Sequence, residues 1–175
     1  MKGQEFLDLL EQENILEEDL PSLLTDELIK KKKKVASAES CTGGMIGMAL
    51  TSVSGISSYY GYGVVTYANE AKEKLLGVSH QTLETFGAVS EETAREMAAG
   101  ALELSGADIA VAVTGIAGPG GGSKEKPVGL VYIGVAEKDG VTAYKNLFFG
   151  SRDEVRRATV IKALELAGNT LNKGE

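Results

Sequence analysis

The stretch Ser37-Ala38-Glu39-Ser40-Cys41-Thr42-Gly43-Gly44-Met45-Ile46-Gly47 decides how this chain is expected to fold. The apolar pair Val35-Ala36 precedes it, and an apolar segment of helical character, 45–53, follows it. The stretch therefore predicts the end of a strand, a tight turn and the start of a helix. Backbone N–H groups at the start of a helix point outward without partners, and the helix dipole favours negative charge there.

The predicted turn carries three side chains with a nucleophilic or hydrogen-bonding atom, those of Ser40, Cys41 and Thr42. A nucleophile in such a turn would have oxyanion donors beside it. Alternatively, Ser40 or Thr42 simply caps the following helix, because Ser and Thr are common N-cap residues. The local sequence alone favours capping over catalysis.

The composition is that of a globular protein, with 43% hydrophobic and 25% charged residues in a chain of 175. This length predicts a single domain with a real core. The net charge of -7 argues against binding to nucleic acids or anionic membranes. One cysteine and one histidine cannot form an intrachain disulfide or a Cys/His metal cluster. A carboxylate-only Mg²⁺ site is left open, but no Asp/Glu cluster suggests one, so neither a metal nor another cofactor is expected. No apolar run reaches transmembrane length and no signal peptide is apparent, so the expected location is cytoplasmic.

The remainder of the chain alternates between helical and strand patterns. The apolar run 109–113 predicts a central strand covered on both faces, and Asp139-Gly140 predicts a tight hairpin turn. Predicted helices cover 22–33, 43–51, 70–76, 80–86, 90–106 and 154–171, and predicted strands cover 35–39, the second half of 59–67, 109–113, 129–136 and 142–149. The pattern predicts a three-layer α/β/α fold with a central mixed sheet and helices on both faces.

The chain is expected to begin with an N-terminal helical extension, residues 1–20, because Phe6, Leu9 and Leu10 have helical spacing among acidic residues. Pro21 opens the next helix, and residues 21–175 form the predicted domain. Two further helix starts are marked by good capping residues, Asn69 and Ser90.

A second glycine-rich loop follows the predicted central strand. Its sequence is Thr114-Gly115-Ile116-Ala117-Gly118-Pro119-Gly120-Gly121-Gly122-Ser123, which is neither a Walker A loop nor a GxGxxG motif. It could be only a mobile connection. However, ligands of open α/β sheets bind outside the carboxyl ends of strands, so two glycine loops at two strand ends favour a shared pocket.

Three groups of basic residues have alternative interpretations. Lysines 31–34 are either an anion site or exposed cations at a helix C-terminus, and the second explanation is favoured because nothing aromatic or glycine-rich accompanies them. Arg152 and Arg156 flank a helix start, where they are either ordinary surface charge or a site for phosphate or carboxylate. His80 is expected on the surface, and no motif around it supports a Ser-His-Asp triad.

Residues 22–171 resemble the C-terminal domain of the CinA (competence/damage-inducible protein) family. The motifs that carry the resemblance are Ser37-Ala38-Glu39-Ser40-Cys41-Thr42-Gly43-Gly44, Val65-Thr66-Tyr67-Ala68-Asn69-Glu70-Ala71-Lys72, Gly87-Ala88-Val89-Ser90, Gly115-Ile116-Ala117-Gly118-Pro119 and Lys126-Pro127-Val128-Gly129. Five motifs in the right order are a specific signal. The resemblance does not extend to the larger N-terminal domain of two-domain family members, so it implies no activity carried there.

The resemblance implies a nicotinamide-nucleotide amidase, which converts nicotinamide mononucleotide to nicotinic acid mononucleotide and ammonia in pyridine nucleotide salvage. It also implies Ser/Lys catalysis with a participating tyrosine. At the matching positions Ser40 is the nucleophile, Lys72 the base and Tyr67 a supporting hydroxyl. The expected substrate-binding residues are Cys41, Thr42, Gly43, Gly44, Thr114, Gly115, Gly118 and Arg152.

The residue chemistry is compatible with this mechanism. A lysine serves as a base if burial or a nearby cation lowers its pKa from about 10.4 toward neutrality. The glycine loop 115–122 and Arg152 are candidates for holding the ribose-phosphate, since backbone N–H groups in glycine-rich turns bind anions. Sequence reasoning alone does not bring Ser40 next to Lys72, and an exposed helical lysine is the simpler interpretation without the resemblance.

Two other functions remain open at this stage. One is a nucleotide- or phosphate-binding α/β module without turnover, and the other is a thiol amidase that uses Cys41. A homodimer is the expected assembly, with the N-terminal amphipathic segment and the glycine- and tyrosine-rich stretch 55–63 as candidate interfaces.

Overall fold

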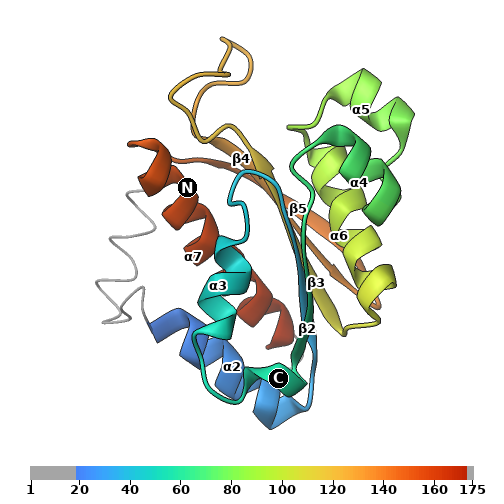
Figure 1. Ribbon diagram of the computed structural model, residues 1–175, viewed down its shortest axis with the longest axis vertical. Coiled ribbons are helices and arrows are strands. Elements are labelled where there is room, and N and C mark those ends of the chain that lie inside the picture. The colour runs from blue at the N-terminus through green and yellow to red at the C-terminus, as the bar shows by residue number, and fades with distance from the viewer. Residues whose placement is uncertain (1–18, 173–175) are drawn as a thin grey trace.

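The computed structural model describes residues 19–172, which form one mixed sheet between two layers of helices (Figure 1). The predicted extension 1–20 lies outside the described residues except for its last two positions. The elements are α2 (Leu20–Lys31), β1 (Val35–Glu39), α3 (Met45–Thr51), the 3-10 turn η2 (Ile56–Ser58), β2 (Tyr60–Val65), α4 (Asn69–Leu76), α5 (His80–Phe86), α6 (Glu91–Ser105), β3 (Ile109–Gly115), β4 (Leu130–Glu137), β5 (Gly140–Leu147) and α7 (Arg152–Leu171). The predicted α/β/α fold is confirmed.

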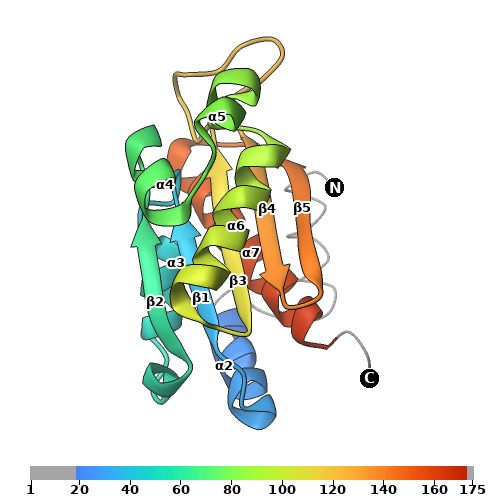
Figure 2. The same ribbon diagram turned by 90° about the vertical axis from the view of Figure 1, so that its right-hand side faces the viewer.

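The five strands lie in the order β2-β1-β3-β4-β5. Strand β1 is parallel to both β2 and β3, whereas β4 is antiparallel to β3 and to β5 (Figure 2). The carboxyl ends of β1, β2 and β3 therefore meet at one edge of the sheet. The segments that follow these strands are the two glycine loops and the start of α4.

Each face of the sheet has its own core. Helices α2, α3 and α7 cover one face, and α4, α5 and α6 cover the other (Figure 1). Alternate residues of β3 point to opposite faces, so Val111 belongs to the first core and Ala112 to the second. A side chain at Gly134 would collide with the backbone oxygen of Ala94, so this glycine lets α6 pack directly on β4.

The predicted cap of α6 is confirmed, whereas those of α3 and α4 are wrong. The N-cap of α3 is Gly44, with no side-chain capping hydrogen bond, so neither Ser40 nor Thr42 caps this helix. Ser90 accepts a hydrogen bond from the Thr93 N–H, and Ser151 forms a reciprocal capping box with Glu154. The prediction that Asn69 caps α4 is wrong: Ala68 is the N-cap, with extended backbone, and Asn69 is the first helical residue. Within residues 19–172, no helix has the length and apolar character needed to cross a membrane.

Candidate functional site

Ser40 and Lys72 meet at the carboxyl edge of the sheet. Lys72 Nζ lies 3.2 Å from Ser40 Oγ, 2.8 Å from the Thr66 carbonyl oxygen and 3.3 Å from the Tyr67 carbonyl oxygen. Ser40 follows β1, and Lys72 lies on α4, which follows β2. Because β1 and β2 are parallel neighbours, the fold brings together two residues that are far apart in the sequence.

The amine of Lys72 is buried among uncharged partners. The residue is only 1% exposed, and burial lowers the pKa of its ammonium group below 10.5, although the nearby Cys41 thiol opposes this shift. Its hydrogen-bonding partners are two carbonyl oxygens and one hydroxyl. A neutral amine can donate its two N–H groups to the carbonyls of Thr66 and Tyr67, which directs its lone pair at the Ser40 hydroxyl. This is the arrangement that a general base requires.

Glu39, which the sequence analysis did not single out, places its side chain at the start of α3. Its buried carboxylate accepts hydrogen bonds from the Thr42 hydroxyl at 2.6 Å and from the N–H groups of Gly44, Ile46 and Gly47 at 2.9, 3.0 and 2.9 Å. The expectation that the N–H groups at this helix start are free is therefore wrong, because an internal anion already satisfies them.

The carbonyl side of the same turn is held by Arg156 from α7. Its Nε donates to the Cys41 carbonyl at 3.2 Å, and its Nη2 donates to the Thr42 carbonyl at 2.9 Å. The Ser40 N–H donates to Val113, and the Gly43 N–H donates to the Ser40 carbonyl. Among the described contacts of the turn, the N–H groups of Cys41 and Thr42 are the remaining candidates for oxyanion donors.

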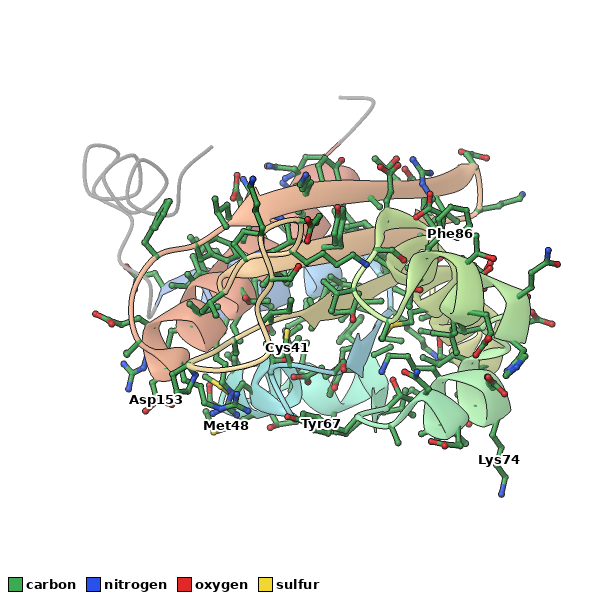
Figure 3. The ribbon with its side chains drawn as sticks, turned by 90° about the horizontal axis from the view of Figure 1, so that it is seen from above. Cys41, Met48, Tyr67, Lys74, Phe86 and Asp153 are labelled. Atoms are coloured by element: carbon green, nitrogen blue, oxygen red, sulfur yellow. The ribbon has the colours of Figure 1, made fainter. Side chains whose placement is uncertain are left out.

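A cavity of about 200 Å³ opens beside Ser40. Its lining residues are Ser40, Cys41, Tyr67, Lys72, Ala88, Val89, Thr114, Gly115, Ala117 and Arg152. Figure 3 looks down on this edge of the sheet, with Cys41 and Tyr67 labelled. The expected shared pocket of the two glycine loops is present.

A larger hollow of about 580 Å³ lies at the opposite end of the sheet, where Lys33 and Asp108 form an ion pair.

The other expected site residues divide into those at the cavity and those behind it. Thr114 lines the cavity, and its hydroxyl donates to the Ala88 carbonyl at 2.6 Å. Gly115 also lines the cavity, and a side chain there would meet Val131. The side chain of Thr42 faces Glu39 instead, and Gly43 and Gly44 have left-handed backbone in the turn behind Ser40.

Tyr67 and Arg152 bridge the two sides of the cavity mouth. Tyr67 is 64% exposed, and its hydroxyl lies 3.4 Å from Arg152 Nη2, while its carbonyl contacts Lys72. Arg152 Nη1 donates to the Gly118 carbonyl at 2.8 Å. The hydroxyl of Tyr67 is thus directed toward Arg152, and Arg152 connects the second glycine loop to the start of α7.

Lys126, which the sequence analysis quoted only as part of a motif, binds backbone next to the cavity. Its Nζ donates to the carbonyls of Phe86 and Val89 at 2.6 and 2.7 Å. The contact fastens the loop between β3 and β4 to the segment before α6, which supplies Ala88 and Val89 to the cavity. The sequence pattern that could have indicated this contact is a lysine beside proline and glycine in a loop. In such a loop a cation can bind carbonyl oxygens that irregular backbone leaves unpaired.

Cys41 and His80 lack the features of catalytic groups. Burial raises the pKa of the Cys41 thiol to about 12, so the thiol is protonated at neutral pH. His80 is exposed on the surface, as expected, and its Nδ1 lies 2.8 Å from Glu73. The described residues contain no group of three or more His, Cys, Asp or Glu side chains that could hold a metal ion.

Comparisons with known proteins agree on one family. The family model described as the CinA C-terminal domain matches residues 17–171. A CinA-like protein of Endomicrobium trichonymphae is 56% identical over 139 residues, which are 79% of this chain and 32% of that protein. A putative competence-damage inducible protein of Alkaliphilus metalliredigens is 51% identical over 88% of this chain and 38% of its own length. The chain therefore spans about a third of the length of such curated relatives.

Solved structures are similar over almost their whole length. The competence/damage inducible protein CihA from Agrobacterium tumefaciens has a TM-score of 0.86 and 48% identity, covering 90% of this chain and 96% of that one. The competence damage-inducible protein A from Klebsiella pneumoniae has a TM-score of 0.87 and 35% identity, covering 91% and 99%.

Proposed function

Because the chain belongs to the CinA family through its C-terminal domain, we propose that it is a nicotinamide-nucleotide amidase that releases ammonia from nicotinamide mononucleotide. The observation that carries the proposal is the 3.2 Å contact between Ser40 Oγ and the buried amine of Lys72. A buried lysine without a carboxylate partner is costly for the fold, and groups with perturbed pKa values in a cavity are typical of catalytic sites.

The first chemical step forms an acyl-enzyme. Neutral Lys72 takes the Ser40 proton while Ser40 Oγ attacks the carboxamide carbon, which gives a tetrahedral oxyanion. The N–H groups of Cys41 and Thr42 are the proposed oxyanion donors. Collapse of the intermediate breaks the C–N bond, and the lysine ammonium returns its proton to the leaving nitrogen, so ammonia departs and an ester to Ser40 remains.

The second step restores the enzyme. Lys72, neutral again, takes a proton from water, whose oxygen attacks the ester carbon. The bond to Ser40 then breaks, the lysine ammonium returns the proton to Ser40, and the product leaves as a carboxylic acid that ionises in solution. The net reaction consumes one water and releases one ammonia for each amide.

Recognition of the nucleotide is assigned to the mouth of the cavity. Arg152 presents a guanidinium beside the second glycine loop, where planar donors suit a phosphate. The α3 start does not offer a second anion site, since the Glu39 carboxylate already occupies it. The ribose-phosphate would therefore extend from the carboxamide at Ser40 toward Arg152 and the loop 115–122.

The alternative function is a nucleotide-binding module without turnover. The discriminating experiment measures ammonia release from nicotinamide mononucleotide and, in parallel, binding of the nucleotide by calorimetry, with Ser40→Ala as the control. The amidase proposal expects turnover by the unaltered protein and binding without turnover by Ser40→Ala. Binding without ammonia release when Ser40 is intact would support the module instead.

A further inference from the structure

Glu39 occupies an unusual position for a carboxylate. It is 2% exposed, it immediately precedes Ser40, and its hydrogen bonds reach from Thr42 to Gly47. Two of its bonds go to one carboxylate oxygen from the N–H groups of Gly44 and Ile46, and the Gly47 N–H binds the other oxygen. A buried charge with this many donors is satisfied in place, and the positive end of α3 stabilises it further.

We infer that Glu39 is a positioning residue for Ser40: its carboxylate is a built-in anion around which the nucleophile turn folds. The activity readouts of this inference rest on the proposed amidase function. Successive side chains of a strand point to opposite faces, so Glu39 faces α3 while Ser40 faces Lys72 on α4. Glu39 therefore holds the turn on the α3 side of the sheet, and Ser40 presents its hydroxyl on the α4 side.

The backbone explains why the turn needs such an anchor. Its near end is held by the sheet, through the Ser40 N–H to Val113 and the Thr66 N–H to the Glu39 carbonyl. Its far end contains Gly43 and Gly44, both with positive φ. Arg156 still holds the Cys41 and Thr42 carbonyls, but glycine gives the chain more conformations than other residues, so the far end can move once the four hydrogen bonds to the carboxylate are lost. Movement there would displace the N–H groups of Cys41 and Thr42 and turn Ser40 away from Lys72.

The same geometry explains why a carboxylate is needed and an amide does not suffice. Four donors converge on Glu39: the Thr42 hydroxyl and the N–H groups of Gly44 and Ile46 reach one carboxylate oxygen, and the Gly47 N–H reaches the other. An ionised carboxylate can accept all four, because neither of its oxygens carries a proton. A glutamine in its place offers one acceptor oxygen, and its NH₂ group would face at least one of the same donors. Its neutral amide also loses the attraction to the start of α3.

The test uses replacement of Glu39 and chemical rescue. Glu39→Ala removes the equivalent of one acetate and leaves its donors in place, so acetate or formate in the buffer can refill the space. We expect kcat for ammonia release to fall about 100-fold in Glu39→Ala and at least about 10-fold in Glu39→Gln, with KM changed less than about threefold. Acetate should restore Glu39→Ala by at least about 10-fold, whereas chloride at equal ionic strength should not.

A matched control is Glu92→Ala, which removes an exposed carboxylate from the first turn of another helix, α6. It should keep kcat and show no response to acetate. Melting curves must show that each variant is folded at the assay temperature. If Glu39 were purely structural, activity would fall in proportion to the fall in melting temperature. If Glu39 is a positioning residue, kcat falls in protein that is still folded, the pH profile of activity is unchanged, and carboxylates restore activity. Loss of less than twofold in both Glu39 variants, or failure of acetate in folded Glu39→Ala, would overturn the inference.

Two readouts do not depend on the substrate. A fluorophosphonate probe reports the reactivity of Ser40 by mass spectrometry, and its labelling rate should fall in Glu39→Ala and recover with acetate. Amide hydrogen exchange of the unaltered protein should show protected N–H groups at Gly44, Ile46 and Gly47, and rapid exchange at all three would contradict the inference even if the variants failed to fold. If the unaltered protein releases no ammonia but these readouts behave as expected, only the proposed substrate fails.

Discussion

The two glycine-rich loops beside the cavity are alike in sequence and different in how they are held. The turn 40–47 follows β1 and is held by a buried carboxylate of that strand, Glu39, together with Arg156 of α7 at the Cys41 and Thr42 carbonyls. The loop between β3 and β4 is held by cations: Arg152 of α7 donates to its Gly118 carbonyl, and its own Lys126 donates to carbonyls of the segment before α6. Glycine content alone therefore does not indicate the function of a loop. We interpret the first as the fixed site of chemistry and the second as the part that adapts to the nucleotide.

The largest expected effect on activity comes from replacing Ser40 in the turn 40–47. Ser40→Ala should lower kcat by at least about 10³-fold, because the Cys41 thiol is held protonated by burial and the Thr42 hydroxyl donates to Glu39. Nucleotide binding, measured by calorimetry, should stay within about threefold, since the second loop and Arg152 supply most of the proposed recognition. A Ser40→Ala protein that retains a tenth of the activity would show that Ser40 is not the nucleophile.

Replacement of Lys72, the proposed base, should lower activity and raise stability. Lys72→Met keeps the side-chain length and removes the buried amine, so we expect a kcat loss of at least about 10²-fold. Burial lowers the pKa of Lys72 in the folded state, so between that value and 10.5 the unfolded chain binds more protons than the folded one. The free energy of unfolding rises with pH across this interval. Lys72→Met should therefore melt at a higher temperature than the unaltered protein at pH 7, and the difference should shrink as the pH approaches 10.5.

The pH dependence of activity tests the same group. A general base must be neutral, so kcat/KM should increase with pH as Lys72 loses its proton, with a midpoint below 10.5. The profile should be unchanged by Lys74→Met, which alters a lysine in the last turn of α4. A midpoint at 10.5 or above would contradict a lysine whose pKa is lowered by burial.

Sequence reasoning predicted the elements well because their signals are local. Ser90 marks a helix start through a contact within a few residues, and the apolar run 109–113 reveals a buried strand. The contact of Ser40 with Lys72 needed the parallel pairing of β1 with β2, which no local pattern encodes.

Glu39 was missed for a different reason. Its carboxylate reaches N–H groups up to eight residues ahead, at Gly47, whereas capping rules look two or three residues ahead. Arg156 was left undecided because an arginine that binds backbone carbonyls has the same local sequence as one that binds a phosphate. In both cases most partners are backbone groups, and backbone contacts leave no mark in the side-chain pattern.

A smaller effect is expected from the second loop. Lys126→Met removes the hydrogen bonds to Phe86 and Val89 and should loosen the wall of the cavity. We expect KM for the nucleotide to rise about threefold to tenfold with kcat changed less, in keeping with the loss of one or two hydrogen bonds. Lys124→Met is the matched control, because Lys124 is an exposed lysine of the same loop. A fall in kcat without a rise in KM would mean that both loops position the reacting atoms.

The smallest effect is expected at Cys41, although its side chain lies next to the nucleophile. The thiol has a pKa of about 12, so it is neither a nucleophile nor a charge at neutral pH, and the proposed contribution of Cys41 is its backbone N–H. Cys41→Ala keeps that N–H and should retain kcat within about threefold, while the small cavity left in the core costs about 1 kcal/mol of stability. Ammonia release and melting temperature measure the two effects separately. A kcat loss as large as that of Ser40→Ala would favour a thiol amidase, and the turn would then act through a side chain that burial holds protonated.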